Sequence, residues 1–132
     1  MDTANVYDNP VRLVNAINSV HDDYLPTITA DGNQLVFTRQ GKRDDENVMI
    51  SEWKKGKWQS SRSFGSAINT KKNEGMAKFE AHGKAFYFAG CMRDDTEGGC
   101  DIYQATLQDG EVQKVNRLEG ELNSHFWDSQ PA

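Results

Sequence analysis

The chain has 132 residues, of which 36% are hydrophobic and 27% charged, and its formal net charge is −5 at pH 7. This length fits one domain or a piece of a larger protein, and the composition is typical of a folded chain. Lysine and arginine form no cluster larger than those at 54–57 and 71–72, which argues against nucleic-acid binding. No apolar run approaches the roughly 18–20 residues of a membrane-spanning helix, so we expect no membrane insertion by this segment.

The predicted elements begin with a strand at about 6–14, which would be the last strand of a preceding unit. Four strands follow, at about 25–29, 34–39, 47–53 and 57–63. The turn sequences ADGNQ, QGKRDDE and KKGK separate them, and the strand segments are rich in β-branched and aromatic residues. A second set of four strands occupies 75–119, with its second strand at Phe86–Cys91 and its third at Cys100–Leu107. Almost no helix is expected.

An internal repeat supports this order of elements. The segment AINSVHDDYLPTITADGNQLVFTR at 16–39 aligns with AINTKKNEGMAKFEAHGKAFYFAG at 67–90, at an offset of 51. The next part, NVMISEWKKGKWQ from Asn47, aligns with DIYQATLQDGEVQ from Asp101 at an offset of 54, because the second copy has a longer loop. A third copy begins at LEGELNSHFWDSQP. Three ordered matches establish the repeat.

Repeats of about 40–50 residues with four antiparallel strands are typical of β-propeller blades. A single blade cannot bury both of its apolar faces, so neighbouring blades must stack on it. We therefore predict an all-β chain with about two complete blades, at 24–66 and 75–119. Partial neighbours would flank them, namely the strand at about 6–14 and the start of the next blade at 120–132. Because a propeller needs roughly four to eight blades, we expect a fragment of a larger propeller or a chain that closes its ring by self-association.

Two polar positions recur in the loop before the first strand of every unit. The amide position is Asn18, Asn69 and Asn123, and the acid position is Asp23, Glu74 and Asp128. A residue that recurs in every blade builds the repeat, whereas an active site breaks its symmetry. We interpret these six residues as a structural clip that joins neighbouring blades by hydrogen bonds.

Three segments carry a resemblance to a known family: INTKKNEG, FYFAGCMRDDTEGGCDIY and LNSHFWDSQPA. They resemble the TolB-like (WD40-like) β-propeller repeats of Gram-negative envelope proteins. Members of that family occur with OmpA-type peptidoglycan-binding domains and in secretion and gliding accessory lipoproteins. The first unit departs from the pattern because Arg39-Gln40 stands where the family hairpin has a cysteine, and the second departs because His82 replaces the usual Asp before Gly83. No OmpA-type domain is present, so peptidoglycan binding is not carried over to this segment.

The two cysteines, Cys91 and Cys100, fall at the base of one predicted hairpin. Opposed residues of antiparallel neighbours lie close enough for a disulfide, which is the interpretation we favour; two free thiols and a metal or redox centre are the alternatives. Zinc would need a second Cys or His pair at short spacing, which the sequence lacks. The acids of the loop do not keep the rhythm of a calcium loop. We expect a solvated acidic hairpin in which Gly98 and Gly99 supply positive φ.

No motif for nucleophilic catalysis or phosphate binding occurs, and no metal or cofactor is expected. The resemblance implies a non-catalytic scaffold of the periplasmic or outer-membrane-associated cell envelope. Its partners would be envelope proteins, peptidoglycan-associated components or a glycan, docked on loops of a propeller face. The loops at 41–46 and 92–99 are expected on one face, whereas the face of 20–24, 71–75 and 125–128 stays open. The alternative function is a propeller glycosidase that uses channel carboxylates such as Asp22, Asp23 and Glu74.

Overall fold

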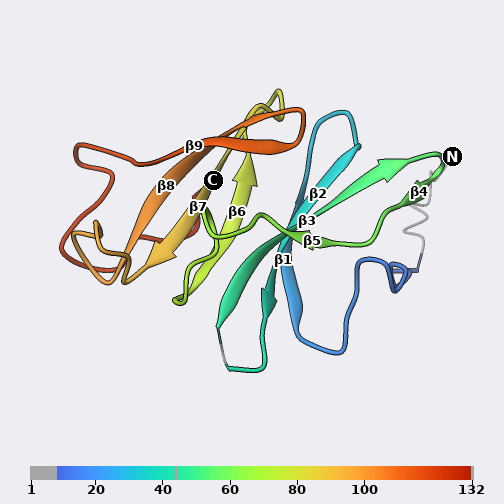
Figure 1. Ribbon diagram of the computed structural model, residues 1–132, viewed down its shortest axis with the longest axis horizontal. Helices are drawn as coiled ribbons and strands as arrows, with labels where there is room; N and C mark the ends of the chain where they lie inside the picture. Colours follow the sequence, from blue (N-terminus) through green and yellow to red (C-terminus); the bar gives the residue numbers. More distant parts are fainter. Residues whose placement is uncertain (1–8, 44, 132) are drawn as a thin grey trace, which may run out of the picture.

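The structure is a computed structural model that describes residues 9–43 and 45–131. These residues form nine β-strands and no helix (Figure 1). All strands pair antiparallel within two sheets. The prediction of an all-β chain built from antiparallel sheets is therefore confirmed.

The first sheet has the strand order β1-β2-β3-β4, and β5 also pairs with β3. Its strands are β1 (Asp23–Ile28), β2 (Gln34–Gln40), β3 (Glu46–Lys54), β4 (Lys57–Trp58) and β5 (Arg62–Ser63). The second sheet has the order β6-β7-β8-β9. Its strands are β6 (Glu74–Phe79), β7 (Ala85–Cys91), β8 (Cys100–Gln108) and β9 (Glu111–Arg117). Each sheet thus occupies one of the two predicted four-strand units, and consecutive strands are neighbours as in a meander.

The predicted fourth strand at 57–63 is interrupted in the structure. It forms β4 and β5, which both pair with β3, and residues 59–61 lie between them. The interruption follows from a contact with a distant segment: the N–H of Gln59 donates to the carbonyl of Glu52, but the N–H of Ser61 donates to the carbonyl of Ala16 at 2.8 Å. The chain therefore leaves the sheet edge to contact the N-terminal segment.

The predicted strand at about 6–14, as the last strand of a preceding unit, stays a prediction. Residues 9–14 belong to no strand, and residues 6–8 lie outside the described residues. A fourth strand of this repeat pairs with the third strand of its own sheet, and the described residues offer no such neighbour to 9–14. The described residues of the third copy form no strand, and their β-pairing with the second sheet is an isolated parallel bridge between Trp127 and Cys100.

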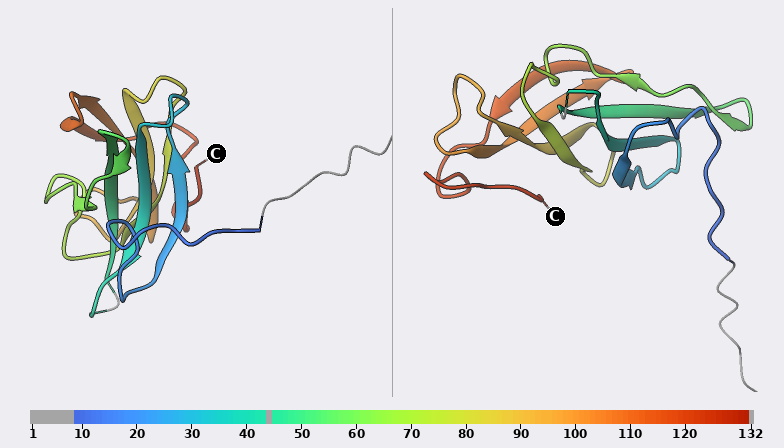
Figure 2. Two further views of the ribbon diagram at one scale, coloured as in Figure 1. Left: turned by 90° about the vertical axis from the view of Figure 1, so that its right-hand side faces the viewer. Right: turned by 90° about the horizontal axis from the view of Figure 1, so that it is seen from below.

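The main core lies between the two sheets, which are twisted and curled (Figure 2). β6 packs against β1, β2 and β3 of the first sheet. The cluster combines residues from both sheets and from the segment between them: Val36, Val48, Ile50, Phe64, Ile68, Ala77, Phe79, Phe86, Phe88, Tyr103 and Ala105. On the opposite face of the first sheet, Leu35 and Phe37 form a smaller cluster with Ile17.

The joint between the sheets is close enough to require glycine at one position. A Cβ at Gly75 would lie 3.0 Å from the side chain of Thr38, a buried residue of β2. The neighbouring N–H of Met76 donates to Thr38 Oγ1 at 3.0 Å. This N–H is available because the pairing of β6 with β7 shifts register between Gly75 and Lys78, where Met76 has φ 56°.

The same backbone irregularity recurs in all three repeats. Leu25, Met76 and Gln130 occupy equivalent positions, and their φ values are 51°, 56° and 60°. Residues other than glycine adopt such values uncommonly. Three occurrences at one repeat position show that the left-handed turn is a regular feature of this unit, although the sequence contains no glycine to indicate it.

Candidate functional site

The loops before β1 and β6 lie at the same end of the sheets as the long hairpin loops. This follows from strand register, since Asp23 at the start of β1 pairs with Arg39 near the end of β2, and Glu74 pairs with Gly90. Loops 64–73 and 92–99 also line common grooves, as described below. The structure thereby places the loops at 20–24 and 71–75, whose face the sequence leaves open, at the same end of the sheets as the loops at 41–46 and 92–99.

Two of the three recurrent asparagines grip the backbone of the preceding sheet. The Asn69 side chain accepts from the N–H of Val48 at 2.7 Å and donates to its carbonyl at 2.9 Å. Asn123 accepts from Ile102 N–H at 2.6 Å and donates to its carbonyl at 3.1 Å. Each carboxamide imitates a paired β-residue and fixes the loop to a third strand. Both asparagines are buried, so these bonds satisfy groups that would otherwise be costly.

Asn18 makes only the local part of this pattern. Its side-chain nitrogen donates to Leu13 O at 2.8 Å, as Asn123 donates to Leu118 O, both five residues upstream. No described residue faces Asn18 in the way that Val48 faces Asn69. The predicted clip therefore joins neighbouring units at two of its three amide positions.

The recurrent acids close their own loops. Asp23 accepts from the N–H and the hydroxyl of Ser19, at 2.7 and 2.9 Å. Glu74 makes the same pair of bonds with Thr70, at 2.8 and 2.6 Å. Asp128 makes them with Ser124, at 2.6 and 2.9 Å. These carboxylates therefore shape the linker within each repeat, and the interpretation of the acids as part of a contact between units needs this correction.

An arginine completes the first two of these acid sites. Arg39 donates to Asp23 at 2.6 Å and to the carbonyl of Ile17 at 2.6 Å. Arg93 lies 3.6 Å from Glu74 and donates to the carbonyl of Ile68 at 2.9 Å. Burial opposes ionisation of Asp23, but hydrogen bonds from Arg39 and Ser19 outweigh it and lower the pKa of its carboxyl.

The two arginines reach the same place from different positions in the repeat. At an offset of 51 the equivalent of Arg39 is Gly90, and a Cβ there would lie 2.7 Å from Arg93 Cδ. Arg93 therefore fills the space above Gly90 from the following loop. Each guanidinium also lies over the ring of an equivalent phenylalanine, Phe37 or Phe88. Sequence alignment could not identify this pair, because the shared feature is a position in space.

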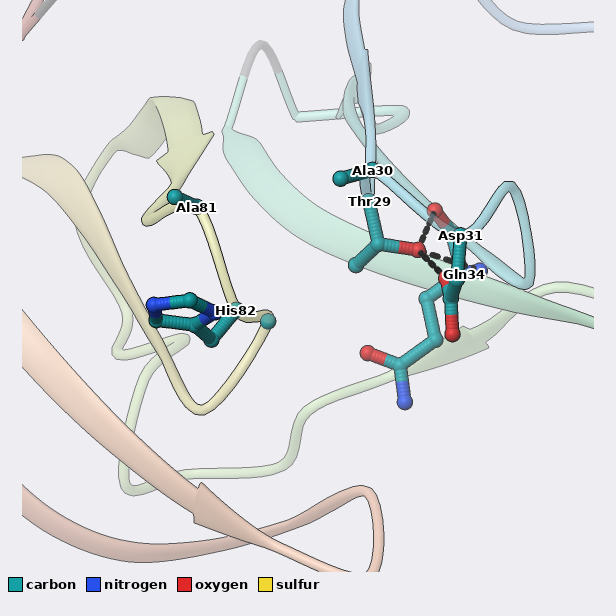
Figure 3. Close-up of a pocket in the computed structure, with 7 residues that line it drawn as sticks. Thr29, Ala30, Asp31, Gln34, Ala81 and His82 are labelled. Carbon is teal, nitrogen blue, oxygen red and sulfur yellow. Dashed lines mark hydrogen bonds between the residues drawn. The ribbon is translucent and has the colours of Figure 1, made fainter.

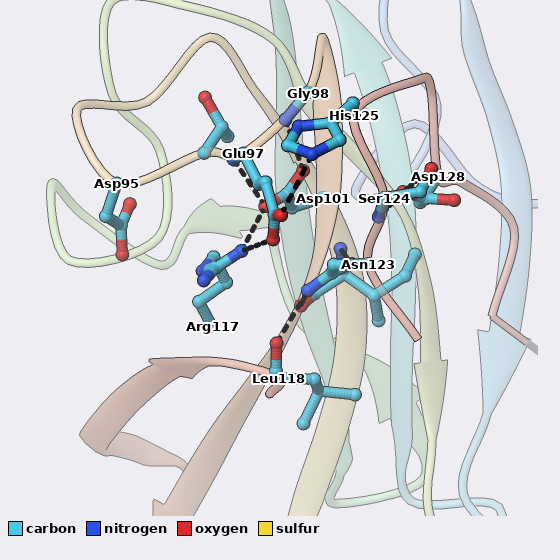
Figure 4. Close-up of polar contacts among 12 residues, drawn as sticks. Asp95, Glu97, Gly98, Asp101, Arg117, Leu118, Asn123, Ser124, His125 and Asp128 are labelled. Atoms are coloured by element: carbon cyan, nitrogen blue, oxygen red, sulfur yellow. Dashed lines mark hydrogen bonds and ion pairs between the residues drawn. The ribbon is translucent and has the colours of Figure 1, made fainter. Parts of the chain in front are cut away.

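The loop at 92–99 is tied down at its base and along its length. Cys91 and Cys100 are opposed in the register of β7 and β8 and are joined by a disulfide. The buried Asp101 accepts from the N–H groups of Glu97 and Gly98 and from Arg117, which also pairs with Glu97 (Figure 4). These carboxylates are engaged by donors within the protein, so the loop is more structured than the solvated hairpin we expected.

Gly98 and Gly99 do not have the positive φ expected from the sequence; the left-handed residue of this loop is Met92. The glycines are needed for close approach instead. A Cβ on Gly98 would overlap the carbonyl oxygen of Phe126, and one on Gly99 would overlap the indole of Trp127. The N–H of Gly99 donates to the carbonyl of Phe126 at 2.9 Å.

Two grooves open among these loops. The larger, of about 450 Å³, lies between 70–72 and 92–95. The adjacent groove, of about 290 Å³, contains residues from all three repeats: Arg43, Asp45, Lys71, Lys72, Asn73, Cys91, Met92 and Trp127. Met92 and Trp127 are exposed to 63% and 74%. The grooves thus combine exposed apolar surface with charges of both signs.

A further pocket, of about 290 Å³, lies at the opposite end of the sheets, between the β1–β2 and β6–β7 turns (Figure 3). Thr29 and Asp31 bond to each other across the first turn at 2.5 Å, and His82 lies on the second turn. The oxygen of Gln34 beside it is buried without a hydrogen-bond partner in the part of the chain that the structure describes. Asp31 and His82 are the titratable residues among the described residues that line this pocket.

Within residues 9–43 and 45–131, no group of His, Cys, Asp and Glu could hold a metal ion. The same residues include no helix suited to crossing a membrane. In comparisons with family models, curated proteins and solved structures, nothing matches this chain.

Proposed function

We propose that this chain is a non-catalytic binding module built from β-propeller blades, which docks a protein ligand in the grooves formed by 70–73, 92–95 and Trp127. The supporting observation is a difference between repeats. Residues that hold the fold recur, as Asn69 and Asn123 do, but the groove residues do not. Asp22, Asn73 and Trp127 occupy one repeat position, and so do His21, Lys72 and Phe126. Such variation on a common scaffold is typical of a surface that selects a ligand.

The composition of the grooves favours a protein over other ligands. Exposed aromatic, methionine and arginine side chains are enriched where protein partners bind, and Trp127, Met92 and Arg43 provide them. Lys71 and Lys72 face Asp94 and Asp95 across the larger groove. A partner with charges of both signs would therefore be oriented as well as bound.

The cell envelope is the proposed setting. The TolB-like resemblance supports it, and the Cys91–Cys100 disulfide is of the kind that persists in oxidising compartments. Candidate partners are then proteins of an outer-membrane secretion or peptidoglycan-associated assembly. The glycosidase alternative is disfavoured because Asp23 and Glu74 accept hydrogen bonds from their loops and contact arginines. Glu74 is moreover fully buried.

The test is affinity capture from an envelope extract with wild-type protein and two variants. Trp127→Ala removes the exposed indole of the groove, and Lys55→Glu alters the tight turn between β3 and β4 at the opposite end of the sheets. We expect one protein to bind wild type and Lys55→Glu with similar affinity, and Trp127→Ala at least tenfold more weakly, since hot-spot aromatics carry about 2 kcal/mol or more.

Equal capture by all three proteins would contradict the proposed groove. Hydrolysis of a glycan panel, assayed in parallel, distinguishes the rival function. Turnover by wild type that is lost in Asp23→Asn, with circular dichroism unchanged, would establish a glycosidase and overturn the proposal. Binding of a glycan without hydrolysis, abolished by Trp127→Ala, would keep the site and replace the ligand class.

A further inference from the structure

One face of the first sheet is an uncovered version of the joint seen inside the chain. β1 and β6 occupy equivalent repeat positions, but β6 is largely buried against the first sheet whereas β1 is largely exposed. Ile28 is 51% exposed, and its equivalent Phe79 is 9% exposed. Leu35 and Phe37 of this face, the equivalents of Phe86 and Phe88, are buried with Ile17, so the uncovered part of the face is its β1 side, where Leu25 is 41% exposed.

Asn18 lies beside this face, and its side chain makes one hydrogen bond where each of its equivalents makes three. Asn69 and Asn123 each exchange two hydrogen bonds with a β-branched residue of a third strand, whereas the Asn18 side chain bonds, among the described residues, to Leu13 alone. A small groove of about 80 Å³ borders it, lined among others by Asp23, Pro26 and Phe37. The face therefore combines apolar surface with a carboxamide placed to grip a strand.

The chain carries the complementary face on its second sheet. In the internal joint, Thr38 and Val48 of the first sheet contribute to the surface that receives β6. Their repeat equivalents on the second sheet are Ala89 and Ile102. Where the internal joint sets Thr38 against Gly75, a joint between copies would set the smaller Ala89 against the larger Tyr24. The atoms of Thr38 that exclude a Cβ at Gly75 are Cγ2 and Oγ1, each at 3.0 Å; Ala89 lacks both, which leaves room for the Cβ of Tyr24.

We propose that two copies of this chain associate head to tail, with the uncovered face of the first sheet stacked on the outer face of the partner's second sheet. Asn18 then forms two hydrogen bonds with the backbone of the partner's Ile102. Within a single chain, Asn123 makes these bonds. The C-terminal segment must yield for this to happen, and it is lightly covered, with Leu122 64% exposed. Asn18 offers the same bonds as Asn123, and because the two faces differ, the contact is heterologous and leaves one free face of each kind on the pair.

The joint between copies is expected to be weaker than the internal one. Ala89 has no hydroxyl, so the bond from Met76 N–H to Thr38 Oγ1 has no counterpart at Leu25. Displacing residues 118–128 also gives up the contacts of Phe126 and Asp128 with Gly99 and Cys100. Association should therefore be reversible and concentration-dependent.

Sedimentation equilibrium of the full chain tests this with a matched pair of substitutions. Asn18→Ala removes the grip and should raise the dissociation constant about tenfold, as expected for two lost hydrogen bonds. Asn123→Ala removes the side chain that competes with the partner's Asn18 for the backbone of Ile102, so it should lower the dissociation constant. Circular dichroism checks that both variants keep the fold. A wild-type chain that is monomeric at all concentrations, or a pair of variants that weaken association equally, would overturn the proposal.

Cross-linking tests the geometry separately. Leu25→Cys and Ala89→Cys each place one thiol on one of the two faces, and the native cysteines are already bonded to each other. Head-to-tail association predicts covalent dimers on oxidation of a mixture of the two variants, and far fewer with either variant alone. Dimers that form equally well from a single variant would show that like faces meet, which contradicts the arrangement.

Discussion

Single side chains of this fold work by imitating backbone. The carboxamides of Asn69 and Asn123 pair with one residue of a neighbouring strand as a β-partner would. The acids do the reverse and accept N–H groups that the loop leaves without partners. Recurrence in the sequence is sufficient to identify these residues as structural, but it does not indicate what they contact, because a repeat alignment contains no distances.

The acid sites predict how stability depends on pH. The folded pKa of Asp23 is lowered below its ordinary value of 3.8, so its contribution to stability is present above pH 3.8 and is lost as the pH falls through the folded pKa. In Arg39→Met this contribution should shrink, with a loss of about 1–3 kcal/mol at pH 7 because a charged hydrogen bond is removed. Urea unfolding of both proteins between pH 3 and 7 measures it. A constant difference across that range would contradict the assignment.

At the scale of elements, the positions of the strands were predictable from the sequence, but the interruption of the edge strand of the first sheet was not. Turn sequences and β-branched runs located the four strands of the first unit, and the second and third strands of the second unit, to within two residues of their observed starts. The tight turns Lys55-Gly56 and Asp109-Gly110 have positive φ at both residues, as the glycine signal indicated. The interrupted strand at 57–63 could not be predicted, since its break depends on Ala16, a contact between distant segments. The same holds for Arg93, whose role depends on the empty space above Gly90.

The disulfide is an element-scale constraint that can be removed cleanly. It closes a loop of nine residues in sequence separation, for which chain entropy suggests about 2–3 kcal/mol. Cys91→Ala/Cys100→Ala should lower the unfolding free energy by about that amount and increase amide hydrogen exchange in 92–99. The buried Asp101 should keep its bonds to Arg117, so β8 and β9 stay protected. Exchange in 92–99 that rises no more than in the two sheets would contradict a local role of the bond in this loop.

At the scale of the whole molecule, the two sheets are stacked, and the main hydrophobic core that stabilises the fold lies in the joint between them. Rings from both β6 and β7 meet there, with Phe86 in contact with Phe64, Phe79 and Phe88. The segment that links the sheets adds Ile68 to the same cluster. Because one core serves both sheets, neither can lose its packing without exposing the other, and we expect the two sheets to unfold as one cooperative unit.

Equivalent residues on covered and uncovered faces allow this to be measured. Phe79→Ala removes a ring from the joint and should cost about 3–5 kcal/mol, whereas Ile28→Ala, at the same repeat position on the exposed face, should cost less than about 1 kcal/mol. Both losses of unfolding free energy are measured at protein concentrations where the chain is monomeric. Their ratio then reports the joint within one chain alone. In a Trp127→Phe background, tryptophan fluorescence follows the first sheet through Trp53 and Trp58, and hydrogen exchange follows the second. Coincident transitions in Phe79→Ala are expected, because the loss is shared; a first sheet that unfolds at the wild-type midpoint would show that the sheets are independent.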